Sequence, residues 1–217
     1  MTVLSWILVC ALAMAAMVLA ERLGSARGRW AAKPVASLAF VGLALAQGLP
    51  PTAYGRVVLV ALVLCLLGDL LLLPERTGPA FLAGLGSFLL GHLAFAAAFF
   101  VLGPDLPWTA AATVALLLPA ALVLRWLWPH LRGPLRMAVP AYITAITAMV
   151  ALAVGAGRAG GPWWVPLGAV LFFLSDISVA RDRFVAPGWK NRLWGLPLYY
   201  GAQVLLALSA LGYSPKG

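Results

Sequence analysis

The sequence is divided into apolar blocks that are each about as long as a lipid bilayer is thick. A transmembrane helix needs roughly 20 mostly apolar residues, and here 64% of the 217 residues are hydrophobic while only 10% are charged. Proline, glycine and charged residues separate the blocks, which predicts eight helices. The expected helices span residues 3–20, 34–49, 56–73, 79–102, 108–128, 135–156, 163–180 and 194–212. We therefore predict an all-α, polytopic integral membrane protein with eight transmembrane helices, in which residues 1–217 form a single membrane domain.

The cationic residues gather around alternate loops of this expected topology. Twelve of the 15 lysines and arginines lie in or beside the loops after the first, third, fifth and seventh helices: Arg22, Arg27, Arg29, Lys33, Arg76, Arg125, Arg132, Arg136, Arg181, Arg183, Lys190 and Arg192. Only Arg56, Arg158 and Lys216 lie elsewhere. The positive-inside rule then makes the odd-numbered loops cytoplasmic and puts both termini on the opposite side of the membrane. This pattern accounts for the net charge of +9, so we expect no nucleic-acid partner, and a bacterial inner membrane is the expected location.

Two aspartates lie inside apolar segments. Asp69 interrupts the leucine-rich run LVLCLLGDLLLLP, and Asp176 lies in LFFLSDISVARDRF. Burying an unpaired carboxylate is costly, so acids within membrane segments are usually functional or paired. Each lies about four residues, or roughly 6 to 8 Å, from the cytoplasmic end of a helix that runs inward. We therefore predict that the two side chains meet in one pocket.

The same two segments share a short internal similarity. GDLLLLPER and SDISVARDR each place a small residue before the aspartate, an acid six residues after it and an arginine next to that acid. The segments occupy expected helices three and seven, which are corresponding positions in the two halves of the chain. The pattern fits two parallel four-helix halves related by an axis along the membrane normal.

Further polar residues are expected to support the aspartates. These candidates are Ser175, Tyr199, Tyr200 and Gln203, with Lys33, Arg181 and Arg183 at the cytoplasmic rim. A primary amide such as that of Gln203 needs hydrogen-bond partners inside a bilayer. The rim cations are either basic flanks of the helices or ligands for an anionic head group. His92 lies deeper in its helix, where it either faces the pocket or bonds across a helix pair.

Four motifs carry a family resemblance: LLGDLLL around Asp69, FLAGLGSFLLGHLAF with His92, GAVLFFLSD ending at Asp176, and YYGAQ from Tyr199 to Gln203. In this order they resemble the YhhN-like family, the lysoplasmalogenases and their relatives. The resemblance implies a membrane hydrolase that cleaves the vinyl ether bond of lysoplasmalogen. The products would be a fatty aldehyde and glycerophosphoethanolamine or glycerophosphocholine. It also implies that Asp69 and Asp176 are the catalytic pair, acting on a lysophospholipid in the bilayer. We expect no metal and no cofactor.

Two carboxyl groups suit this chemistry. Vinyl ethers hydrolyse in acid, when a proton is delivered to the alkene carbon remote from oxygen and water adds to the resulting oxocarbenium ion. A site for this reaction needs one protonated and one ionised carboxyl, which two acids in a low-dielectric pocket supply. Apolar neighbours favour Asp69 as the acid, whereas the serines beside Asp176 favour its ionised form.

Two other functions fit the same residues. A proton-coupled transporter of a lipid or small molecule would also place acids inside glycine-rich membrane helices. A metal-dependent hydrolase would use Asp69, Asp176 and His92 as ligands, although the expected depth of His92 opposes this. The position of the acids toward one face favours chemistry on a lipid. No feature of the sequence predicts an oligomeric state.

Overall fold

Helices form almost the whole of the computed structural model, which describes residues 1–74 and 78–211. The eight α-helices are α1 (Val3–Arg22), α2 (Ala26–Ala44), α3 (Ala53–Leu71), α4 (Pro79–Val101), α5 (Leu106–Leu127), α6 (Leu135–Arg158), α7 (Trp164–Ala180) and α8 (Trp189–Ser209). A short 3-10 helix, η1 (Trp128–His130), follows α5, and a π-helical turn, η2 (Arg181–Val185), continues α7. The all-α prediction is confirmed, as is the presence of eight helices in the described part of the chain.

Short polar side chains start several of these helices. Thr2, Ser25, Thr52 and Asp105 each precede a helix and accept a hydrogen bond from the backbone N–H three residues later. Such caps bind N–H groups that have no partner within the helix. Between α1 and α2, Gly24 adopts a φ of 65°, which glycine reaches without steric cost. The chain can therefore reverse direction within a few residues.

The sequence-based start of α2 at residue 34 was wrong. α2 begins at Ala26 because Ser25 caps it, and Pro34 lies inside the helix. A proline often starts a helix, and this preference misplaced the boundary. The longer helix places Arg29, Lys33 and Ser37 at intervals of four residues, which puts them on one helix face. At the other end of the chain, residue 212 of the expected helix 194–212 lies outside the described residues.

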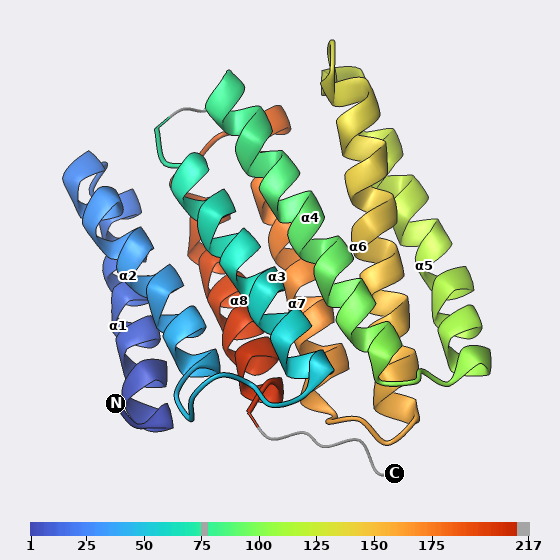
Figure 1. Ribbon diagram of the computed structural model, residues 1–217. Coiled ribbons are helices and arrows are strands. Elements are labelled where there is room, and N and C mark those ends of the chain that lie inside the picture. The colour runs from blue at the N-terminus through green and yellow to red at the C-terminus, as the bar shows by residue number, and fades with distance from the viewer. Residues whose placement is uncertain (75–77, 212–217) are drawn as a thin grey trace.

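The helices stand side by side and alternate in direction, so the N-terminus and the last residue of α8 lie at the same end of the bundle (Figure 1). α1 and α2 form one side and α5 and α6 the other, while α3, α4, α7 and α8 occupy the middle (Figure 1). The loops after α1, α3, α5 and α7 therefore meet at the end opposite the termini. Most of the lysines and arginines are at this end, which is called the basic end below. Arg76 and Lys216 lie outside the described residues.

Six of the described helical segments are long and apolar enough to cross a membrane. They are α1, α3, α4, α5 with η1, α6, and α7 with η2. α5 is the most exposed, and its leucines Leu117, Leu118 and Leu122 are bare on the surface. Such faces are typical of helices that contact lipid. The expected eight spans exceed this number because α2 and α8 carry cations along their basic ends.

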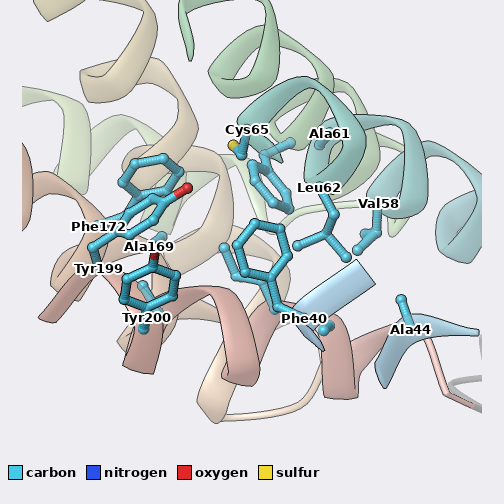
Figure 2. Close-up of a cluster of buried hydrophobic side chains, with 14 of the residues drawn as sticks. Phe40, Ala44, Val58, Ala61, Leu62, Cys65, Ala169, Phe172, Tyr199 and Tyr200 are labelled. Atoms are coloured by element: carbon cyan, nitrogen blue, oxygen red, sulfur yellow. The ribbon is translucent and has the colours of Figure 1, made fainter. Parts of the chain in front are cut away.

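Aromatic rings fill the centre of the bundle. Phe40 of α2 packs edge-on against Tyr199 of α8 and at a tilt against Tyr200, with ring centroids 6.3 Å apart in both cases. Figure 2 shows these rings beside Phe172 of α7 and the small and aliphatic residues of α3. Aromatic pairs in such geometries add to the energy of burial. The packing holds α2, α7 and α8 together around the residues described next.

Candidate active site

Asp69 of α3 and Asp176 of α7 line the same cavity. The cavity has a volume of about 130 Å³ and lies toward the basic end of the bundle. Apolar side chains of α4, α5, α6 and α7 form most of its wall, among them Leu85, Phe88, Leu127, Val139, Ile146 and Phe173. The two intramembrane acids thus face one largely apolar space, as their placement in the sequence predicts.

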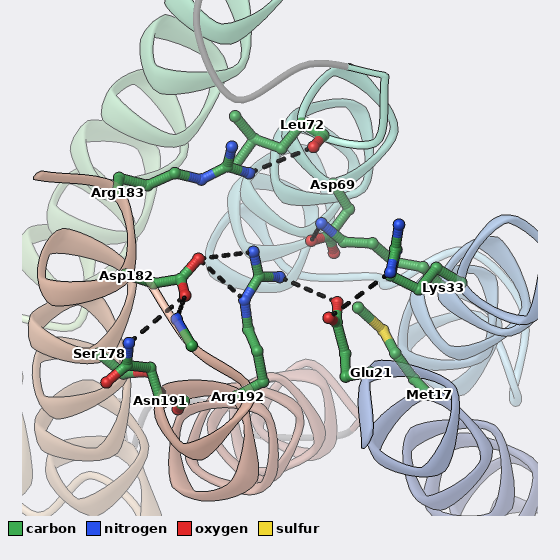
Figure 3. Close-up of polar contacts among 12 residues, drawn as sticks. Met17, Glu21, Lys33, Asp69, Leu72, Ser178, Asp182, Arg183, Asn191 and Arg192 are labelled. Atoms are coloured by element: carbon green, nitrogen blue, oxygen red, sulfur yellow. Dashed lines mark hydrogen bonds and ion pairs between the residues drawn. The ribbon is translucent and has the colours of Figure 1, made fainter. Parts of the chain in front are cut away.

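Three donors hold the carboxylate of Asp69. The Lys33 Nζ atom lies 3.1 Å from its Oδ1 atom, and Figure 3 shows the lysine pointing at the aspartate. The hydroxyl groups of Ser37 and Tyr199 each donate to Oδ2 at 2.7 Å. Asp69 and Lys33 are both buried. A buried carboxylate with a cation and two hydroxyl donors has the partners that its ionised form needs.

Asp176 has a different environment. The Tyr142 hydroxyl of α6 donates to its Oδ2 atom at 2.9 Å, and the Nε2 atom of His92 lies 3.4 Å from the same oxygen. Among the described residues, no lysine or arginine forms an ion pair with Asp176. The side chain of Asp176 is 19% exposed, against 3% for that of Asp69. Asp176 is therefore the more accessible of the two acids.

The hydrogen bonds of His92 define what it can offer Asp176. Its Nδ1 atom lies 2.8 Å from the carbonyl oxygen of Phe88, and a carbonyl only accepts, so Nδ1 carries a hydrogen. Neutral histidine then has a lone pair on Nε2. A lone pair facing an ionised carboxylate at 3.4 Å is repulsive unless a proton lies between them. The Nε2 atom is buried and has no hydrogen-bond partner among the described residues, so a proton on either group would relieve this repulsion.

Aromatic rings connect the two acidic groups. The Phe172 ring lies 4.3 Å from the His92 ring and 5.5 Å from the Tyr199 ring, measured between centroids. Phe88 packs edge-on against Phe172 and Tyr199. Residues that bind Asp69 and residues that bind Asp176 therefore share one packed cluster. A shift of α7 or α8 would move both sets.

The two aspartates were expected about four residues from the ends of their helices, and these distances differ in the structure. Asp69 lies two residues from the end of α3 at Leu71. Asp176 lies nine residues before the end of η2 at Val185, because the π-helical turn continues α7 beyond Ala180. The depth of His92 in α4 had opposed a role at the same site, yet its Nε2 atom lies 3.4 Å from the Oδ2 atom of Asp176. His92 therefore reaches Asp176 directly.

The remaining predicted residues divide into three groups. Lys33, Tyr199 and Arg183 line the cavity. Tyr200 lies one contact away, with its hydroxyl 3.4 Å from the Ser37 Oγ atom. Three others point elsewhere: Ser175 donates to the Phe172 carbonyl, Arg181 binds the Asn191 side chain, and Gln203 is buried outside the cavity wall.

Two supporting residues were not among the predicted ones. Tyr142 lies in a helix whose polar residues the sequence could not separate into packing and lining groups. Ser37 follows Lys33 by one helical turn of α2. The expected helix began at residue 34 and left Lys33 outside, so this spacing was not recognised. The spacing of Arg29, Lys33 and Ser37 is the signal that would have found it.

Among residues 1–74 and 78–211, no three His, Cys, Asp or Glu side chains lie close enough together to hold a metal ion. His92 and Asp176 are adjacent, but Asp69 is bound by Lys33 instead. The donor set of a two-aspartate, one-histidine site is thus not assembled in this part of the chain.

Comparison with known protein families identifies the family of this chain. A sequence profile of the YhhN family matches residues 28–210, which include every residue of the cavity described above. The chain belongs to the YhhN family. The matched region starts two residues after the first residue of α2 and ends just past α8.

Named relatives of this YhhN protein come from bacteria and mammals. A lysoplasmalogenase of Mycobacterium bovis is 35% identical over 178 residues, which are 79% of this chain and 66% of the relative. Lysoplasmalogenase TMEM86B of Sus scrofa is 38% identical over 157 residues, covering 72% and 63% of the two chains. Lysoplasmalogenase TMEM86A of Bos taurus is 31% identical over 160 residues, covering 71% and 65%. The chain spans just under two thirds of the length of these relatives. No solved structure matches it significantly.

Proposed function

We propose that this protein hydrolyses the vinyl ether bond of lysoplasmalogens. The products are a fatty aldehyde and glycerophosphoethanolamine or glycerophosphocholine. The names of its relatives support this activity. The observation that carries the proposal is that Asp69 and Asp176 line one mostly apolar cavity from two different helices. Such a cavity suits a lipid chain whose reactive bond must meet an acid.

Asp176 is proposed as the acid. It faces His92 across 3.4 Å, and this pair needs one proton between two groups that otherwise repel. Asp69, with Lys33 at 3.1 Å and two hydroxyl donors at 2.7 Å, is proposed to stay ionised. These roles reverse the assignment that the flanking residues alone favoured. The physical reason is that contacts from other helices, and not sequence neighbours, decide which acid is paired.

The reaction then follows from these states. The Asp176–His92 pair gives its proton to the alkene carbon remote from oxygen, and the vinyl ether becomes an oxocarbenium ion. The ionised Asp69 stabilises this cation, as a carboxylate does in glycoside hydrolysis. Water attacks the carbon bonded to oxygen and returns a proton to the Asp176–His92 pair. The resulting hemiacetal transfers its hydroxyl proton to the glycerol oxygen and separates into aldehyde and alcohol, so one water is consumed and the pair is restored.

The bilayer position is part of the proposal. We infer that α2 and α8 cross the membrane together with the six apolar segments, because they lie alongside them in the bundle and alternate with them in direction (Figure 1). The basic end then faces the cytoplasm of a bacterium, and both ends of the chain face the other side of its inner membrane. The two four-helix halves stay a prediction, because Glu75 and Arg76 of the first repeat lie outside the described residues.

The test is an assay of purified protein in lipid nanodiscs. Lysoplasmalogen is offered beside an ester-linked lysophospholipid of the same chain length, and aldehyde and fatty acid are measured. We expect aldehyde from the vinyl ether and no fatty acid from the ester. Absence of aldehyde from a folded preparation would contradict the proposal. Substrate-driven proton flux into sealed vesicles without product would favour a transporter instead.

A further inference from the structure

A second cavity lies beside the first, closer to the basic end. It has a volume of about 150 Å³, which is room for several groups the size of a water molecule at roughly 30 Å³ each. Four cations line it together with Glu21: these are Arg29, Lys33, Arg183 and Arg192. The side chains come from α1, α2, η2 and α8. Residues far apart in the sequence thus bring positive charge to one place.

The two cavities are neighbours that share part of their walls. Lys33, Leu72, Arg183 and Arg192 line both. The first cavity is walled mainly by apolar side chains, whereas cations dominate the second. Together they offer a cationic compartment joined to an apolar one, which matches an amphiphile with one anionic end.

Ion pairs hold the cationic compartment in shape. Arg192 binds Asp182 through Nη2 at 2.8 Å and Glu21 through Nη1 at 3.3 Å, and Figure 3 shows it between these two acids. Asp182 also accepts hydrogen bonds from the Gly188 backbone and the Asn191 side chain. η2, α8 and α1 are therefore fastened together through Arg192. Ion pairs and hydrogen bonds therefore fix the position of this part of the wall.

Arg29 differs from Arg192 in how it is bound. Its Nη1 atom lies 3.9 Å from the Glu21 Oε2 atom, which is longer than a hydrogen bond. The Arg29 side chain is 34% exposed, against 20% for Arg192. Arg29 can therefore turn toward an incoming anion at little cost. It lies one helical turn before Lys33 on the same face of α2, and Lys33 in turn contacts Asp69.

We propose that this cationic compartment binds the phosphodiester of the lysolipid head group, with Arg29 as a binding residue. Arginine presents planar donors that match phosphate oxygens. The inference rests on the proposed function, because it assumes that a lysolipid occupies the apolar cavity. It also replaces Arg181 in the predicted head-group set, since Arg181 binds Asn191 and lines neither cavity.

The experiment measures binding without hydrolysis. A 1-O-alkyl lysophosphocholine has a saturated ether that the proposed chemistry does not cleave, so its affinity for purified protein is read even from an inactive preparation. We expect Arg29→Gln to weaken this affinity by about tenfold or more, the size of a lost hydrogen bond to a charged group. Arg27→Gln is the matched control, because Arg27 is exposed on the same helix and lines neither cavity. The control is expected to bind like the wild type.

Two further ligands identify what the compartment recognises. A 1-O-alkyl glycerol, which lacks the phosphate, is expected to bind the wild type and Arg29→Gln equally. Glycerophosphocholine is expected to displace the alkyl lysolipid more strongly than inorganic phosphate does. Unchanged lysolipid affinity in Arg29→Gln, an equal loss for the alkyl glycerol, or equal displacement by inorganic phosphate would each overturn the inference. If the wild type binds the lysolipid through Arg29 yet releases no aldehyde, only the proposed hydrolysis fails.

Discussion

The Nε2 atom of His92 lies 3.4 Å from the Oδ2 atom of Asp176, and the other ring nitrogen of His92 is committed to the Phe88 carbonyl. This relationship joins a residue of α4 to one of α7 and places a buried ring nitrogen beside the carboxyl group. It makes Asp176 the acid of the proposed reaction. The predictions below begin with this pair.

Asp176→Asn removes the proton donor while keeping the shape of the side chain. We expect kcat for aldehyde release to fall at least about a hundredfold, the usual contribution of a general acid. Asp105→Asn serves as the control, since Asp105 caps α5 far from the cavity and asparagine also caps helices. Near-normal turnover by folded Asp176→Asn would exclude the assigned role.

His92→Phe tests the positioning role of the histidine. Phenylalanine retains the ring that packs on Phe172 and Tyr142 but offers no nitrogen to Asp176. Because His92 does not line the cavity wall, we expect KM to stay the same while kcat falls by about tenfold or more. Steady-state kinetics separate the two constants. A raised KM with unchanged kcat would instead show that His92 contributes to substrate binding.

The Lys33–Asp69 ion pair predicts non-additive stability changes. Lys33→Met leaves the Asp69 carboxylate buried without its cation, and loss of one partner of a buried pair costs about 3–5 kcal/mol. Adding Asp69→Asn removes the stranded charge, so the double variant should be more stable than Lys33→Met alone. Unfolding in mixed detergent micelles, followed by circular dichroism, measures each free energy of unfolding. Strict additivity of the two substitutions would show that the residues do not interact.

Gly195→Ala is expected to disturb the contact between α8 and α7. A Cβ at position 195 would lie 2.6 Å from the Cβ of Ser178, a short side chain that cannot move aside. Overpacking of this kind costs about 1–3 kcal/mol. It would also displace Tyr199, which lies one helical turn after Gly195 in α8. Gly86→Ala is the control, because a Cβ there meets nothing within 4 Å. Thermal unfolding should show a loss for the first variant and none for the second.

Cysteine labelling tests the inferred orientation. The native residues Cys10 and Cys65 are buried, so an impermeant maleimide should leave the unmodified chain unlabelled. Ala159→Cys lies at the end of α6 that shares its side with the termini, whereas Lys190→Cys lies at the basic end. In intact bacteria we expect labelling of the first variant, and labelling of the second only after the membrane is permeabilised. The reverse pattern would invert the topology.

The helices and the two buried acids could be predicted from the sequence, because both features depend on local composition. Apolar length alone locates most helices, and a carboxylate among leucines stands out without any structure. That Asp69 and Asp176 face one cavity followed from their similar placement on two helices of the same direction, although their distances from the helix ends differ.

The partners of the acids could not be predicted in the same way, because they come from other helices. Lys33 was expected at the rim, yet it reaches Asp69 at 3.1 Å. Ser37 was missed because Pro34 was taken as the first residue of α2 instead of an interior one. The contact between His92 and Asp176 also joins two helices, and the expected depth of His92 spoke against it. The roles proposed for the two acids are therefore the reverse of those that the flanking residues favoured.

Lys33 belongs to the walls of both cavities and so marks the boundary between them. A lysolipid bound across this boundary would be cut near it, and each fragment would then be left in surroundings that suit its own solubility. The glycerophosphate product would diffuse into the cytosol, whereas the fatty aldehyde would partition into the hydrocarbon region of the bilayer. Each product would therefore have its own exit, and accumulation of one would not block departure of the other.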